Sequence, residues 1–157
     1  MSWFVIDTCV LVDASGQGVS QHAEASHRLL THLRNDDRFI LAVDSKGKIL
    51  RQYSERICAP MFAHHWLEAL QPSRIRAVSL NCIPKGPRVA LLENRLHRGD
   101  FPLVEGALGS DKIIVTRDFP SFSEGIQDIL RRRLGIYIYP AADMIEILFA
   151  SDFERGS

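Results

Sequence analysis

Strand and helix patterns alternate along the chain, and this alternation predicts an α/β fold, with a mostly parallel sheet covered by helices on both faces. The strand patterns support this, because 39–43 and 113–115 are continuous apolar runs, as expected for strands buried on both faces. The 157 residues suit one domain with one hydrophobic core. No repeat or linker divides residues 1–157, so the sequence predicts a single α/β/α sandwich.

In the first half of the chain, the apolar run 3–6 predicts a buried central strand that ends at Asp7. Leu29, Leu30 and Leu33 recur at helical spacing and predict a helix from about Ser20 to Arg34. The further expected elements are a strand over 39–43, a turn over 44–47, helices over 49–57 and 61–70, and a strand over 76–80.

In the second half, Pro87 predicts the start of a helix running to about residue 97, because the missing N–H of proline has no partner in a first helical turn. Asp100 is placed to cap a short helix that ends near residue 109. Ser121 and Glu124 have the spacing of a capping box. The remaining expected elements are a strand over 113–116, a helix that stops at Gly135, a strand over 136–139 and a final helix from Pro140.

The composition, with 46% hydrophobic and 24% charged residues, is that of an ordinary globular protein. No apolar run approaches the length of a membrane span, and the first residues lack the pattern of a secretory signal. Cys9, Cys58 and Cys82 are odd in number and have no paired spacing, which argues against a disulfide framework or a zinc knuckle. We therefore expect no membrane association and a reducing, cytoplasmic compartment.

The charge balance by itself identifies no partner. The formal net charge is zero, whereas a protein that binds nucleic acid by charge alone is basic. A carboxylate cluster can offset a basic rim, so neutrality does not exclude such binding. The densest basic run, Arg131 to Arg133, is better explained as a solvated helix face, and Arg117, Lys46 and Lys48 lie elsewhere.

Four acidic residues are expected at one edge of the sheet. Asp7 and Asp44 directly follow strands, Asp118 lies just past a third strand, and Asp100 begins a helix. Ligands of open parallel sheets gather beyond the carboxyl ends of the strands, where these side chains would meet. Crowded carboxylates raise one another's pKa unless a cation neutralises them, and oxygen ligands suit Mg²⁺ or Mn²⁺. Such ions support phosphodiester hydrolysis.

Each acid also has a purely structural interpretation. Asp44 before Ser-Lys-Gly is better explained as a turn residue, and Asp100 alone is more often a plain helix cap. Asp118 could simply shape the turn that follows its strand. Asp7 is hardest to explain in this way, because an acid that ends a buried strand loses hydration. The coincidence of all four at one edge favours a site.

Two segments resemble the motifs of the PIN-domain family. Val5-Ile6-Asp7-Thr8-Cys9-Val10-Leu11 is similar to its opening motif, and the segment from Gly99-Asp100-Phe101 to Thr116-Arg117-Asp118-Phe119 is similar to its closing motif. The resemblance implies a five-stranded parallel sheet and a metal-dependent endoribonuclease, with Asp7, Asp100 and Asp118 as ligands of Mg²⁺ or Mn²⁺ and Thr116 as a supporting group. It further implies RNA as substrate and two candidate partners, which are an antitoxin-like protein and a second copy of the chain in a homodimer.

One position departs from this family pattern. Gly47, Ile49 and Tyr53 match the helix that follows the second strand, but Gln52 stands where the family has a glutamate. Glu55 lies three residues further along the same expected helix and could compensate. The alternative is a catalytically weakened or inactive PIN-like module that binds RNA or a protein partner.

Other enzyme classes fit less well. A phosphatase of the haloacid-dehalogenase type needs an acid two residues after the nucleophile, where this chain has Cys9. No Gly-x-x-x-x-Gly-Lys loop is present, which excludes P-loop nucleotide hydrolysis. His64 and His65 are adjacent on an expected helix and point in different directions, so an ordinary helix surface explains them better than a shared ligand role.

Overall fold

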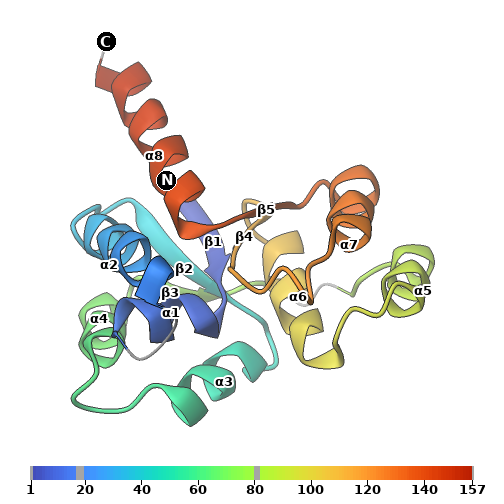
Figure 1. Ribbon diagram of the computed structural model, residues 1–157, viewed down its shortest axis with the longest axis horizontal. Coiled ribbons are helices and arrows are strands. Elements are labelled where there is room, and N and C mark those ends of the chain that lie inside the picture. The colour runs from blue at the N-terminus through green and yellow to red at the C-terminus, as the bar shows by residue number, and fades with distance from the viewer. Residues whose placement is uncertain (1, 17–19, 80–81, 157) are drawn as a thin grey trace.

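Five parallel strands form a sheet in the order β3-β2-β1-β4-β5, with β1 at the centre (Figure 1). The structure is a computed structural model that describes residues 2–16, 20–79 and 82–156. The predicted α/β class with a mostly parallel sheet is therefore confirmed. The strands are β1 (Ser2–Ile6), β2 (Phe39–Val43), β3 (Ile75–Ala77), β4 (Ile113–Val115) and β5 (Tyr137–Tyr139).

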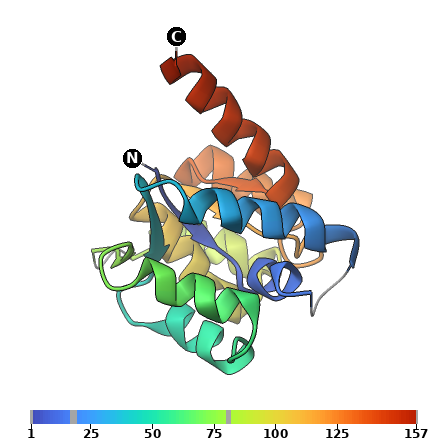
Figure 2. The ribbon, with the colours of Figure 1, turned by 90° about the vertical axis from the view of Figure 1, so that its left-hand side faces the viewer.

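Helices connect the strands and cover the sheet (Figures 1 and 2). The first half of the final helix packs on the core through Met144, Ile145 and Leu148, and its C-terminal part projects beyond the rest of the chain in both views. No helix in the described ranges is long and apolar enough to cross a membrane. The helices are α1 (Thr8–Ala14), α2 (Ser20–Arg34), α3 (Lys48–Arg56), α4 (Phe62–Leu70), α5 (Lys85–Glu93), η1 (Arg98–Asp100, a 3₁₀ turn), α6 (Phe101–Leu108), α7 (Glu124–Ile129), η2 (Leu130–Leu134, a π turn) and α8 (Ala141–Gly156).

The side chains of consecutive residues in β1 point to opposite faces of the sheet, as the pleat of a strand requires. Phe4 contacts Phe39 of β2, and Phe39 in turn contacts Trp66 of α4, with ring centroids 5.0 and 6.2 Å apart. Val5 faces α6, where Gly106 allows a close approach: a Cβ added to Gly106 would lie 3.0 Å from Val5 Cγ2. The fully buried aliphatic core therefore continues through both faces of the sheet.

The boundaries differ from the sequence expectations at a few elements. Helix α5 ends at Glu93 rather than near residue 97, because Arg95 adopts the left-handed conformation (φ 67°) and the Leu96 N–H turns back to Leu91 O. Strand β3 begins one residue early and ends at Ala77, and Leu80, its expected end, lies outside the described residues. Helix α1 was not predicted from the sequence.

The capping box expected at Ser121 is wrong. Ser123 is the N-cap of α7, and its hydroxyl accepts the Ile126 N–H at 3.4 Å. Ser121 instead lies in the loop before α7, where its hydroxyl donates to the carboxylate of Asp100. The shift of two residues moves this serine from a helix end to the candidate site.

Candidate active site

The candidate site lies where the strand order reverses direction. From β1 the chain builds β2 and β3 on one side, then returns to build β4 and β5 on the other side. Asp7 directly follows β1, and Thr116 directly follows the neighbouring strand β4. The backbone N–H of Asp7 donates to Val115 O at 2.9 Å, which fixes the two strand ends together. Open α/β sheets bind ligands outside such a switch point.

Thr116 connects the two acids that follow these strands. Its hydroxyl donates to Asp7 Oδ2 at 2.8 Å and accepts the backbone N–H of Asp118 at 3.0 Å. The thiol of Cys9 lies 3.6 Å from the same hydroxyl. The threonine is fully buried, so these contacts hold its hydroxyl in one orientation. The side chain expected as a supporting group thus positions Asp7 directly.

Asp7 is buried in a setting that disfavours its charge. Burial raises the pKa of Asp7 above the ordinary carboxyl value, the Thr116 hydrogen bond opposes this rise, and the charge of Asp100 adds to it. Tyr53 of α3 lies behind β1 and donates its hydroxyl to Ile6 O, next to Asp7. The strand end that carries Asp7 is therefore held from both the sheet and α3.

Asp100 does not cap α6 with its side chain, although it occupies the N-cap position. Its Oδ2 instead accepts a hydrogen bond from the hydroxyl of Ser121. Burial raises the pKa of Asp100, the Ser121 hydroxyl opposes this rise, and the charge of Asp118 adds to it. The charge of Asp118 thus raises the pKa of Asp100, and the charge of Asp100 raises the pKa of Asp7.

One cavity of about 260 Å³ brings the three predicted acids together. Asp118 is half-buried there, and its Oδ1 accepts the Ser121 N–H at 3.3 Å, so this carboxylate also shapes the loop. The cavity also includes Gln52, which stands where the family pattern has a glutamate, and Glu55, the acid considered as its substitute. It is lined by Asp7, Thr8, Cys9, Gln52, Glu55, Arg56, His97, Gly99, Asp100 and Asp118.

Gln52 reaches the cavity but uses its amide nitrogen structurally. The Nε2 group donates to Gly99 O at 2.8 Å, which ties α3 to the turn that carries Asp100. Glu55 lies one helical turn further along and is exposed at the rim of the cavity. The position that lacks the expected acid is therefore occupied by a side chain that bridges two walls of the site.

Asp44 is not a member of the cavity. Its carboxylate is buried and accepts the backbone N–H groups of Lys48 and Ile49, at 3.0 and 2.7 Å. These are orphan donors in the first turn of α3, so Asp44 stabilises the start of that helix. Of the four acids expected at the edge, this one has the structural role that its turn sequence indicates.

An ion pair that the sequence did not reveal lies behind the site. The fully buried Asp13 of α1 accepts a hydrogen bond from Arg117 Nε, and Arg117 immediately precedes Asp118. The partnership joins residues 104 positions apart, and no local pattern could have indicated it. His97 was also missed: it lines the cavity, and its Nδ1 accepts the Gly99 N–H at 3.0 Å.

The donors at this cavity suit a hydrated divalent cation better than a closed metal cage. Within the described residues, no group of three or more His, Cys, Asp or Glu side chains is placed to hold one ion. Asp7 and Asp100 interact electrostatically, and the buried Thr8 hydroxyl beside Asp7 has no hydrogen-bond partner within the described chain. Mg²⁺ keeps several waters and is often held by one or two carboxylates together with a substrate phosphate. The residues present fit that mode of binding.

Other residues considered from the sequence have surface or structural roles. Arg131 and Arg132 both contact Asp128, as expected for a solvated helix face. His64 pairs with Glu68 on the surface of α4, at 2.8 Å. The three cysteines are free, and only Cys9 is buried.

Comparison with known proteins finds no match for this chain. No protein-family model matches the chain, and neither the curated proteins nor the solved structures contain a match. The chemistry of the cavity therefore rests on its own residues.

Proposed function

We propose that this chain is a divalent-metal-dependent nuclease, an endoribonuclease of the PIN-like type. The observation that carries the proposal is the arrangement of Asp7, Asp100 and Asp118 around one cavity at the switch point of the sheet. Burial and the charge of a neighbouring acid raise the pKa of Asp7 and of Asp100, and such raised pKa values are typical of functional sites. A cation would relieve that repulsion, and a phosphodiester would supply its remaining ligands.

The residues divide into binding and positioning roles. Asp7 and Asp100 would hold Mg²⁺ or Mn²⁺, and Asp118 would complete the acidic wall. Thr116 orients Asp7, and Ser121 orients Asp100, each through a hydroxyl that donates to the carboxylate. The chemistry that the cation supplies is charge compensation at the phosphodiester and acidification of water. The Thr8 hydroxyl is the one buried donor beside Asp7 still available to a ligand among the described residues.

A second candidate function is a binding module without catalysis. Gln52 favours it, because the amide contributes no charge to the cavity and its nitrogen is engaged by Gly99 O. Such a module would keep RNA or a protein as partner but would not cleave. An antitoxin-like protein, a homodimer and a cytoplasmic location accompany either candidate as parts of the proposal.

Cleavage of a single-stranded RNA with Mn²⁺, and again with EDTA, tests the two candidates. We expect Mn²⁺-dependent cleavage by the parent and none by Asp7→Asn. Asp143→Asn is the matched control. It removes the same charge from an exposed position in the first turn of α8, outside the cavity. Cleavage that survives Asp7→Asn would exclude the proposed site, and RNA binding without any cleavage would favour the binding module.

A further inference from the structure

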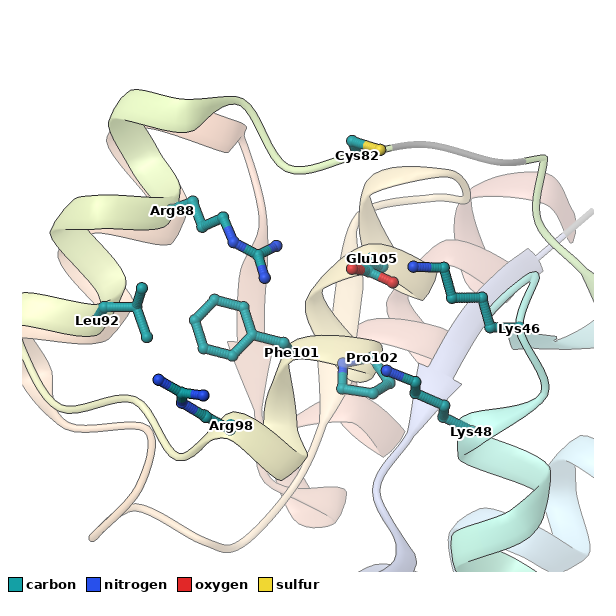
Figure 3. Close-up of a pocket in the computed structure, with 9 residues that line it drawn as sticks. All are labelled: Lys46, Lys48, Cys82, Arg88, Leu92, Arg98, Phe101, Pro102 and Glu105. Carbon is teal, nitrogen blue, oxygen red and sulfur yellow. The ribbon is translucent and has the colours of Figure 1, made fainter.

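A second cavity, of about 350 Å³, lies between the start of α3, helix α5 and helix α6 (Figure 3). Four cationic side chains line it: Lys46 and Lys48 from the turn and first residue of α3, Arg88 from α5, and Arg98 from η1. Glu105 of α6 is its one acidic lining residue. We call this the basic cavity.

The four positive charges of the basic cavity outnumber the single negative charge of Glu105 that lines it. All four cations are exposed, and within the described chain none of them forms an ion pair with a carboxylate. Figure 3 shows the two arginines on either side of Phe101, with Lys48 ending beside Pro102 and Lys46 ending beside Glu105. Cations gathered in a concave surface focus their field and attract an anion.

The floor of the basic cavity favours phosphates over bases. Phe101 is buried, and the guanidinium of Arg88 lies over its ring, 5.2 Å from the centroid. The ring face that could stack on a base is therefore already covered by a cation. What the cavity offers a ligand is charge and N–H donors, which suit phosphate oxygens.

The cavity that is lined by Asp7, Asp100 and Asp118, which we call the acidic cavity, shares one turn of the backbone with the basic cavity. His97, Gly99 and Asp100 line the acidic cavity, whereas Arg98 and Phe101 line the basic one. Residues that line the two cavities are thus interspersed along 97–101. Helix α3 repeats this arrangement, because its first residue lines the basic cavity and residues 52, 55 and 56 line the acidic cavity. The two cavities are therefore joined through the 97–101 turn and through α3.

We propose that the basic cavity holds backbone phosphates of a single-stranded RNA while a neighbouring phosphodiester of the same strand lies at the acidic cavity. This inference rests on the proposed nuclease function, which it extends by naming how the substrate is held. A single strand is flexible enough to follow the 97–101 turn from one cavity to the other, whereas a duplex is stiff, with a persistence length of about 50 nm in the case of DNA. Because the contacts are to phosphates, binding is independent of base sequence.

The test measures binding of a short fluorescein-labelled single-stranded RNA by anisotropy, in EDTA and over a range of KCl concentrations. The variant Lys48→Gln/Arg98→Gln removes two charges from the basic cavity. The matched control Arg131→Gln/Arg132→Gln removes two charges from the exposed surface of η2. For single strands each phosphate contact contributes about 0.7 to the slope of log K against log salt, so we expect the cavity variant to lose about 1.4 in slope and about tenfold in affinity. The control should keep the parent's values.

The inference is overturned if the cavity variant and its control lose affinity equally, if neither loses any, or if the parent does not bind RNA in EDTA at low salt. Equal binding of the duplex form would overturn the preference for a single strand. If the double variant melts below the parent, Lys46→Gln replaces it, with an expected loss of about 0.7 in slope.

The same measurements separate this inference from the proposed nuclease function. Charge-dependent binding in EDTA without any cleavage in Mn²⁺ would retain the phosphate site and exclude the nuclease. Cleavage that requires Asp7 but is unchanged in the cavity variant would retain the nuclease and exclude the phosphate site.

Discussion

The side-chain amide of Gln52 donates its hydrogen bond to the backbone carbonyl of Gly99, at 2.8 Å. The amide nitrogen is therefore engaged at this position of the acidic cavity. A glutamate at the same place would set a carboxylate against a carbonyl oxygen. The consequence is that adding the missing acid changes the stability of the site as well as its charge.

For Gln52→Glu we expect lower stability in EDTA and a larger stabilisation by Mn²⁺ than in the parent. The Gly99 carbonyl loses its donor, which costs about 1–3 kcal/mol, whereas the added charge strengthens attraction for a cation. Thermal melts in EDTA and in MnCl₂ measure both effects. Glu55→Gln is the comparison, because Glu55 is exposed and its loss should leave the EDTA melt nearly unchanged. An EDTA melt of Gln52→Glu equal to the parent's would contradict the hydrogen bond to Gly99.

For Asp7→Asn we expect a metal-free protein that is more stable than the parent at neutral pH. An acid whose pKa is higher in the folded chain binds more protons when folded. The free energy of unfolding therefore falls as the pH rises from the unfolded value of 3.8 through the raised folded pKa of Asp7. Asp7→Asn cannot lose stability in this way. Its free energy of unfolding should therefore exceed that of the parent above the raised pKa of Asp7, and the difference should vanish below pH 3.8. Urea unfolding across the pH range in EDTA tests the prediction, and a constant advantage at all pH values would refute it.

For Thr116→Val we expect a loss of about 1–3 kcal/mol, because the Asp7 carboxylate and the Asp118 N–H both lose a buried partner. Thr116→Ser keeps the hydroxyl and should retain most of that stability and the Mn²⁺ response. Urea unfolding of both variants at neutral pH provides the measurement. Equal losses in the two variants would mean that the methyl group, not the hydroxyl, accounts for the effect.

For the cysteines we expect two fast-reacting thiols and one protected thiol in the native protein. Cys58 and Cys82 are exposed, whereas burial, followed by the charge of Asp7, raises the pKa of Cys9 to about 12. Titration with a thiol-specific disulfide reagent at mildly alkaline pH should therefore modify two groups at once and the third only after unfolding. Rapid native modification of Cys9 would show that the edge of the sheet is more open than described.

The placement of Asp7 and Asp118 could be predicted from the sequence because it follows from strand order. Parallel strands end at one edge, so residues that follow two adjacent strands must lie near each other. The role of Asp44 could also be predicted, since turns of its composition use the carboxylate locally.

Other features depend on contacts that no local pattern encodes. Helix α1 was missed because its sequence is almost uniformly apolar, and such a run has no period that separates a helix from a strand. Ser121 was assigned to a cap because its spacing to Glu124 fits, but Ser123 has a matching hydroxyl closer to the helix. The orientation of the Gln52 amide depends on how α3 meets the 97–101 turn, which is a tertiary property.

The absence of a side chain at Gly106 lets α6 lie close to the sheet. The helix rests on Val5 and Ile49 at this point, and a methyl group there would meet them at 3.0 and 3.3 Å. Asp100 and Phe101 stand at the start of the same helix, one beside each cavity. A side chain at residue 106 would require Val5 or Ile49 to give way by a few tenths of an ångström, or α6 to move away from them. The distance between α6 and the sheet, and with it the position of both cavity walls relative to Asp7, therefore depends on this one core position.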